Sequence, residues 1–160
     1  MVFGYQSARD FFEAARCAAM EAQRTERQME RLAAAEGVRA NGMAAGSGTR
    51  RDPNGMAATD ARIDYERRMR RRLEEDRALV GRACSLAYGP SGDGGVAKLL
   101  GASYADAIWW RYCSASSWAC VAEAVGASSS TVRRWCDVAM DMIDSKGQDA
   151  VMAGIGDAAA

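Results

Sequence analysis

The chain has 160 residues, of which 49% are hydrophobic, and its 21 basic residues balance 21 acidic ones. No apolar run approaches the ~20 residues needed to cross a bilayer, and the first residues lack the basic and apolar regions of a secretory signal peptide. We therefore expect a cytoplasmic protein of one or two small domains that has no membrane segment.

The chain contains five cysteines and no histidine. Because the cysteines are odd in number and form no C-x-x-C pair, we expect them to be reduced core residues and not zinc ligands. The missing histidine excludes Ser-His-Asp and Cys-His catalytic arrangements. The glycine cluster at 92–95 lacks the strand that precedes a phosphate-binding loop. We expect a protein that is not an enzyme and that uses neither a metal nor a cofactor.

A first long helix is predicted for residues 7–36, because Ser7 and Asp10 form a capping pattern and neither proline nor glycine interrupts the segment. Its apolar stripe has roughly heptad spacing and comprises Phe12, Ala15, Ala19, Ala22, Met29 and Ala33. Two interpretations of the stripe are open. The helix packs on its own chain, or it forms a coiled-coil homodimer in which Phe12, Ala19 and Met29 make the contacts.

Residues 37–59 are rich in glycine, alanine and asparagine and contain the sequence NGMAA twice. Asn-Gly pairs favour turns, so we expect a connector here. A second long helix is predicted for residues 60–88, ending at Gly89 and Pro90. Its apolar side comprises Met69, Leu73, Val80, Cys84 and Ala87.

Five arginines lie within residues 67–72 of the second helix. Such a cluster favours phosphate binding, and the candidate phosphate contacts are Arg67, Arg68 and Arg71, together with Arg111 and Lys146 further along the chain. The alternative is a solvated face in which arginines pair with carboxylates four residues later: Arg70 with Glu74, Arg71 with Glu75 and Arg72 with Asp76.

Shorter helices are predicted after a turn at residues 90–95. Residues 96–100 are expected to form one helical turn that ends at Gly101, and Ser103 with Asp106 is expected to cap the next helix, which runs through Tyr112. Residues 103–144 are therefore predicted to form three packed helices.

The sequence SWACVAEAVGASSSTVRRW, residues 117–135, predicts a helix-turn-helix motif. Alanine allows the helices to approach closely, glycine adopts a left-handed turn without strain, and serine caps the second helix. The structural residues of the motif are Trp118, Ala122, Gly126, Ser128, Val132 and Trp135. Hydroxyls and arginines reach phosphates and base edges in a major groove, so the candidate DNA-binding residues are Ser129, Ser130, Thr131, Arg133 and Arg134.

The segment IWWRYCSASSWACVAEAVGASSSTVRRWCDVAM resembles the C-terminal helix-turn-helix of phage- and prophage-encoded transcription regulators related to region 4 of sigma factors, of the late-transcription activator type. The matching positions are Ile108, Arg111, Tyr112, Trp118, Ala122, Gly126, Ser128, Val132, Ala139 and Met140. The two long helices and the glycine-rich segment between them are also similar to those proteins. The resemblance implies recognition of a promoter element in double-stranded DNA and contact with RNA polymerase.

Residues 101–160 carry four basic and seven acidic residues, whereas DNA-binding domains are typically basic. Additional positive charge would come from residues 61–80, with seven basic and five acidic residues, or from a second copy of the chain. Otherwise the motif binds protein. The two hypotheses are a phage-type DNA-binding regulator and a protein-interaction or assembly factor, such as an RNA polymerase-binding protein or a small DNA-packaging subunit.

The predicted fold is all-α, with long helices in a coiled-coil-like hairpin followed by a helix-turn-helix bundle. The predicted parts are a long helix (1–36), a connector (37–59), a domain formed by the second long helix and the helix-turn-helix (60–145), and a flexible tail (146–160).

Overall fold

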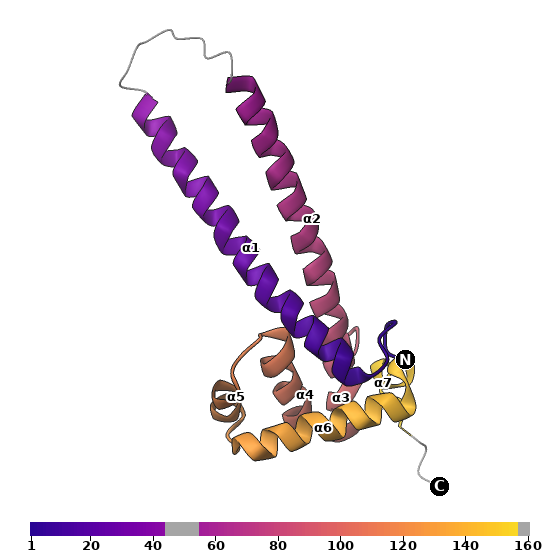
Figure 1. Ribbon diagram of the computed structural model, residues 1–160. Helices are drawn as coiled ribbons and strands as arrows, with labels where there is room; N and C mark the ends of the chain where they lie inside the picture. The colour runs from indigo at the N-terminus through magenta and orange to yellow at the C-terminus, as the bar shows by residue number, and fades with distance from the viewer. Residues whose placement is uncertain (44–54, 157–160) are drawn as a thin grey trace. The chain divides into compact units, whose positions relative to one another are not determined.

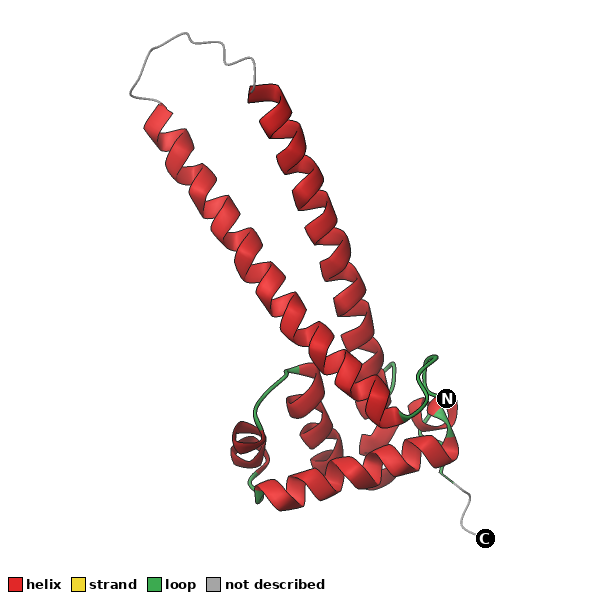
Figure 2. Ribbon diagram, in the orientation of Figure 1, coloured by secondary structure: helices red, strands yellow, loops and turns green. Residues whose placement is uncertain are grey.

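The computed structural model describes residues 1–43 and 55–156, and this part of the chain is all-α (Figures 1 and 2). The helices are α1 (Ala8–Met43), α2 (Gly55–Tyr88), α3 (Gly95–Leu100), α4 (Ala102–Ile108), the π-helical segment η1 (Trp109–Cys113), α5 (Trp118–Val125), α6 (Ser129–Lys146) and α7 (Gln148–Met152). The predicted all-α class is confirmed. Within these two ranges, no helix is both long enough and apolar enough to cross a membrane.

The described residues divide into two compact units. Unit 1 comprises residues 1–20 and those described from 76 onward, and unit 2 comprises those described within 21–75. The predicted division was different, because it assigned all of the first helix to one part and all of the second helix to another. Each long helix contributes one stretch to each unit.

Both long helices extend beyond their predicted ends. α1 continues to Met43 and α2 begins at Gly55, so both ends of the predicted connector are helical. The first Asn-Gly pair, Asn41 and Gly42, lies inside α1 and not in a turn. Glycine within a helix costs only about 1 kcal/mol relative to alanine, which the neighbouring helix-forming residues offset. The rest of the predicted connector, residues 44–54, lies outside the described residues.

The N-terminus of α1 is capped both locally and by α6. The Ser7 Oγ accepts a hydrogen bond from the Asp10 amide at 3.1 Å, which confirms the predicted cap. The Asp144 Oδ1 of α6 accepts the Ala8 amide at 2.7 Å, and Arg9 pairs with Asp137 at 2.7 Å. The first amides of a helix have no partners within it, so α6 completes the end of α1.

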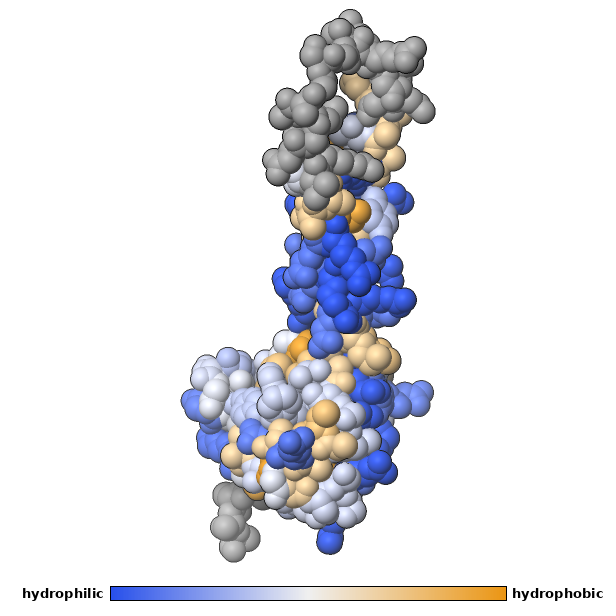
Figure 3. Space-filling view, turned by 90° about the vertical axis from the view of Figure 1, so that its left-hand side faces the viewer, coloured by the Kyte–Doolittle hydropathy of each residue, from blue (hydrophilic) through white to orange (hydrophobic). Residues whose placement is uncertain are grey.

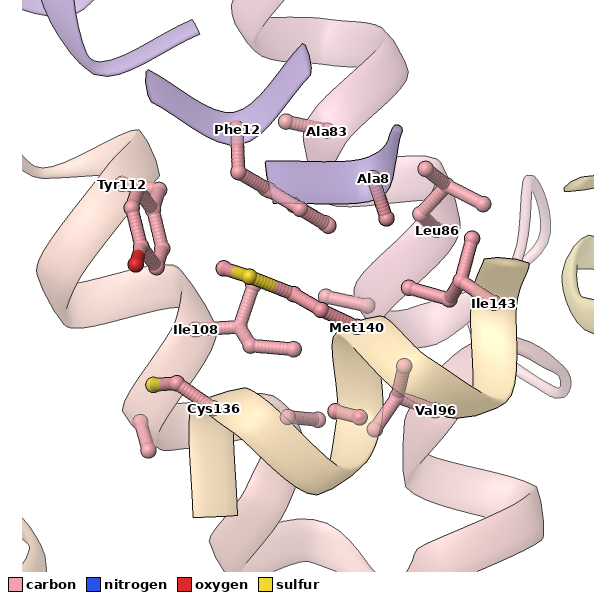
Figure 4. Packing of buried hydrophobic residues seen from close by; sticks show 14 of the residues in the cluster. Ala8, Phe12, Ala83, Leu86, Val96, Ile108, Tyr112, Cys136, Met140 and Ile143 are labelled. Atoms are coloured by element: carbon pink, nitrogen blue, oxygen red, sulfur yellow. The ribbon is translucent and has the colours of Figure 1, made fainter. Parts of the chain in front are cut away.

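The core of unit 1 collects apolar side chains from the two long helices and from the short ones, as Figure 4 shows. Phe12 of α1 packs with its ring centre 5.4 Å from that of Tyr112. Leu86, Met140 and Ile143 are also fully buried there. Burying a side chain of this size contributes about 1.5–3 kcal/mol.

The packing of α1 shows whether its apolar stripe lies on its own chain or is available for a coiled-coil homodimer. Phe12, Ala15, Ala19 and Ala22 are all buried by their own chain. The expectation that Phe12 and Ala19 form a dimer seam is therefore wrong. Met29, the third predicted contact, is half-buried.

The segment from α3 to η1 departs from the predicted capping. α4 starts at Ala102 after Gly101, and its first residues show no side-chain cap, so the predicted Ser103 cap is wrong. Asp106 instead accepts a hydrogen bond from the Tyr88 hydroxyl at 2.6 Å. The helix then widens into η1, and a π-helical turn changes which residues face the core. Tyr112 is buried there.

The predicted tail is partly helical and packed. α7 occupies Gln148–Met152, and Val151 is fully buried in the core of unit 1. A Cβ added to Gly94 would lie 2.2 Å from the main-chain oxygen of Met152, so a glycine is needed where the turn before α3 meets the end of α7. The expected flexible tail is therefore wrong for α7.

The five cysteines are free, and their environments differ. Cys113 and Cys136 are buried as predicted, whereas Cys17 and Cys120 are exposed and do not belong to the core. Cys84 is half-buried, and a hydrogen bond from the Cys113 thiol lowers the pKa of Cys84. Burial raises the pKa of Cys136 to about 12, so this thiol stays protonated.

Candidate nucleic-acid interface

The connection between α5 and α6 has the backbone geometry that the sequence predicts. α5 starts at the Ser117 cap, whose hydroxyl accepts the Cys120 amide at 3.3 Å. It ends at Gly126, which has the left-handed dihedral angles φ 68° and ψ 34°. Ser128 then caps α6 by accepting the Thr131 amide at 3.2 Å. The short turn therefore fixes the direction in which α6 leaves α5.

The inner side of this helix pair packs into the core of unit 1. Val121 of α5 and Val132 of α6 are fully buried. Ala122 and Trp135 lie half-buried at the edge, where the Trp135 ring is 5.5 Å from the Tyr104 ring. α6 also contacts α4, so the helix pair packs on a further helix of unit 1.

The outer side of α6 begins with a group of hydroxyls. The Ser128 Oγ lies 2.9 Å from the Ser130 Oγ and 2.8 Å from the Thr131 Oγ1. Ser130 is exposed, whereas Ser129 and Thr131 are half-buried. The amino end of a helix carries partial positive charge, so exposed hydroxyls at this end suit a phosphate oxygen.

Arg133 and Arg134 follow these hydroxyls and are both exposed. The Arg133 guanidinium lies 5.2 Å from the centre of the Trp118 ring, and that of Arg111 lies 4.4 Å from the same ring. Attraction between a cation and a ring of this kind is worth about 0.5–2 kcal/mol. Trp118 therefore links the first helix of the pair to an arginine on the outer side of the second.

Arg111, a predicted phosphate contact, makes its contacts within the chain. Its Nη1 donates to the Ser116 carbonyl at 2.9 Å, and the side chain is half-buried beside Trp118. Arg111 thus holds the loop before α5. This arrangement disfavours phosphate binding by Arg111, because its guanidinium already contacts Ser116 and Trp118.

One of the remaining predicted phosphate contacts, Lys146, lies far from the start of α6. Lys146 is the last residue of α6, and at 1.5 Å per residue it lies about 25 Å along the helix from Ser129. Arg67, Arg68 and Arg71 belong to unit 2. Within unit 1 the structure therefore brings together the hydroxyls, Arg133, Arg134 and Trp118, and it places Lys146 at the opposite end of α6.

Several acidic residues of the 101–160 segment are used in tertiary contacts. Asp137 pairs with Arg9, Asp144 accepts the Ala8 amide, and Asp106 accepts the Tyr88 hydroxyl. The hydrogen bond to Asp137 raises the pKa of Arg9, and burial together with Asp106 raises the pKa of Tyr88. These acids have structural roles, and Arg9 adds positive charge that the segment alone lacks.

The arginine cluster of α2 is exposed at all five positions. Two arginines of the cluster pair with acidic residues that lie toward the amino end of α2: Arg67 lies 3.7 Å from Asp64, and Arg70 lies 3.9 Å from Glu66. Arg70 therefore pairs with Glu66 and not, as predicted, with Glu74. Glu66 also accepts a hydrogen bond from Arg62 at 3.1 Å. Exposed pairs of this length contribute little to stability.

Two further observations concern ligands and relatives. In the part of the chain that the structure describes, no three cysteine or acidic side chains are grouped so that they could hold a metal ion. Comparisons of the chain with protein-family models, with curated proteins and with solved structures gave no match.

Proposed function

We propose that the protein is a DNA-binding transcription regulator of phage or prophage type, in which α5 and α6 act as a helix-turn-helix. One observation carries the proposal. Directly after the left-handed Gly126 and the Ser128 cap, α6 exposes Ser130, Arg133 and Arg134 while its other side is buried at Val132. A helix that enters a major groove needs this distribution.

The proposal gives each outer residue a role. The Ser130 hydroxyl and the first amides of α6 bind a phosphate, which fixes the register of the helix on the duplex. Arg133 and Arg134 reach base edges, since a guanidinium binds guanine in a bidentate manner. α6 is the recognition helix and α5 is not, because α5 exposes the acidic Glu123.

The resemblance to sigma-type modules extends the proposal to partners and location. A regulator of this type contacts RNA polymerase as well as double-stranded DNA, and it acts in the cytoplasm. Negative charge on residues 101–160 disfavours DNA binding, but Asp137 and Asp144 of α6 are engaged with α1. The first eight residues of α6, from Ser129 to Cys136, carry only the two arginines as charged residues.

The second candidate function is protein interaction or assembly. Unit 1 exposes 37% of Trp110 and 38% of Val138, which are large apolar side chains. Exposed aromatic residues are enriched at protein interfaces. In this alternative the helix pair contacts a subunit and its arginines form ion pairs across the interface.

Duplex binding across a salt series separates the two candidates. The measurement is fluorescence anisotropy of a random-sequence duplex with the full chain and with the double variant R133A/R134A. We expect the logarithm of the affinity to fall steeply with the logarithm of salt, by about 0.9 for each neutralised phosphate. The variant should bind this duplex more weakly and with a smaller salt slope where the two arginines touch phosphate, and it should lose about 1–3 kcal/mol for each lost base contact on a specific site.

A matched control removes two exposed arginines of unit 1 that are not on α6. The double variant R77A/R82A has the same change in charge. It should bind DNA nearly as the parent does. DNA binding that is absent, or equal in R133A/R134A and the parent, would favour the assembly function.

A further inference from the structure

Unit 2 contains a groove between its two helical stretches that the helix-turn-helix proposal does not use. The groove has a volume of about 750 Å³, and residues of both α1 and α2 line it. Three of the lining residues are arginines: Arg24 from α1, and Arg68 and Arg72 from α2. Residues four apart share one side of a helix, so Arg68 and Arg72 face the same groove as Arg24.

The neutral residues that line the groove supply an apolar surface and a hydrogen bond between the two helices. Met69 is 7% exposed and supplies an apolar surface. The Gln28 amide donates a hydrogen bond to the Tyr65 hydroxyl at 2.6 Å, which joins the two helices across the groove. The Arg68 Nε donates to the Asp64 carbonyl at 3.2 Å. This bond orients the Arg68 side chain and leaves its terminal nitrogens as donors.

The charges that line the groove are not balanced. Glu21 is the single acidic residue among the lining residues, and it lies 3.7 Å from Arg24. Like charges that share a groove repel one another, and an anion placed between them removes this cost. The planar guanidinium forms paired hydrogen bonds with phosphate oxygens, which makes phosphate the matching anion.

The surroundings of the groove favour a polymer over a small ion. Arg68 also lines a second hollow of about 300 Å³, together with Arg67, Arg71 and one acidic residue, Asp64. The basic surface therefore continues along α2 beyond the groove. Figure 3 shows one face of unit 2, and much of this face is hydrophilic. A nucleic acid carries regularly spaced phosphates and can occupy both hollows at once.

We propose that this groove binds backbone phosphates of a nucleic acid through Arg24, Arg68 and Arg72. The proposal rests on the DNA-binding function and adds a second, sequence-independent contact surface to it. It also gives the arginine cluster of α2 a partner, and it adds Arg24 and Arg72 to the phosphate contacts that the sequence suggested.

The test compares two triple variants of the full chain in the salt series. The groove variant is R24Q/R68Q/R72Q. The control variant R27Q/R31Q/R70Q removes three exposed arginines of the same two helices that do not line the groove. All six side chains are exposed, so both variants should fold, and circular dichroism verifies this.

We expect the groove variant to reduce the salt slope by about 2–3, one contact for each arginine, and the control variant to reduce it by less than 1. Equal reductions in the two variants would overturn the proposal, since total charge alone would then explain them. An unchanged slope in the groove variant would overturn it as well.

The R133A/R134A variant separates this proposal from the function on which it rests. If that variant loses binding while the groove variant does not, the groove proposal fails and the helix-turn-helix function stands. If the groove variant loses binding while R133A/R134A does not, the groove binds DNA and α6 does not. If inorganic phosphate raises the melting temperature through the groove arginines but no duplex binds, the occupant is a free anion and the nucleic-acid proposal is overturned.

Discussion

The Arg133 guanidinium lies 5.2 Å from the centre of the Trp118 ring, so an arginine on the outer side of α6 is held by the first residue of α5. A free arginine loses about 2 kcal/mol of side-chain entropy when a ligand fixes it. Contact with a ring restricts the side chain before binding. Trp118 is therefore a positioning residue for Arg133 in the proposed function.

Replacing Trp118 with leucine should weaken DNA binding through Arg133, by about 0.5–2 kcal/mol if the cation–ring contact carries the effect. Trp118→Phe should retain most of the affinity because it keeps a ring. The measurement is a double-mutant cycle: W118L should have no further effect in a chain that already carries R133A. A full additional loss in that background would show that Trp118 acts on stability and not on Arg133.

Replacing Gly126 with valine should destabilise unit 1 by on the order of 1–3 kcal/mol, because a β-branched residue is strained at a φ of 68°. A Cβ here meets no atom within 4 Å, so backbone strain alone is tested. Gly126→Asn should cost less, since asparagine tolerates left-handed angles. Chemical denaturation measures both, and an equal loss for the two variants would contradict this account.

Replacing Gly94 with alanine should also destabilise unit 1, by about 1–3 kcal/mol, for a different reason. The added Cβ would lie 2.2 Å from the Met152 carbonyl oxygen, and main chain cannot move aside easily. Gly81→Ala is the matched control, because Gly81 lies inside α2 with open space around its Cβ position. The control should stabilise by about 0.5–1 kcal/mol. Equal melting temperatures for G94A and the parent would mean that α7 does not pack against this turn.

Stability should fall at alkaline pH because of two tyrosines. Burial raises the pKa of Tyr88 and of Tyr112 above the ordinary value of 10.0. A raised pKa in the folded chain means that the stabilising contribution is complete below pH 10 and is lost as the pH rises beyond it. Denaturation between pH 8 and 11 measures this loss. The variant Y88F/Y112F should show a smaller decrease over the same range, and an identical decrease would assign the effect to other groups.

Removing the Asp144 carboxylate should uncap α1. Asp144→Ala leaves the Ala8 amide without this acceptor, and loss of such a cap costs about 0.5–2 kcal/mol. Asp137→Ala is the comparison, because its pair with Arg9 is exposed and should contribute at most about 1 kcal/mol. Thermal unfolding should give D144A a lower melting temperature than D137A, and the reverse order would contradict the capping role.

Local sequence patterns predicted the parts of the fold that depend on neighbouring residues. The Ser7 and Ser128 caps and the left-handed Gly126 follow from residue types within one turn of a helix, and all three are found. The stop of α2 at Tyr88, before Gly89, is of the same kind.

Features that depend on distant residues could not be predicted in this way. Nothing near Asp144 indicates that it caps a helix 136 residues earlier. The π-helical turn that places Arg111 beside Trp118 has no pattern of its own in the sequence. The arginine groove likewise requires the pairing of α1 with α2, which brings Arg24 opposite Arg68.

The bond between Asp144 and Ala8 also sets an order of events during protein synthesis. A ribosome makes α1 early, but Phe12 packs against Tyr112 of η1, which is translated much later. Until η1 and α6 have left the exit tunnel, the nascent chain lacks the side chains that bury this ring. Unit 1 therefore closes only at a late stage of translation, and contacts of such long range slow its folding. A stop codon placed before α6 should release a chain that proteases remove, however complete its first helices are.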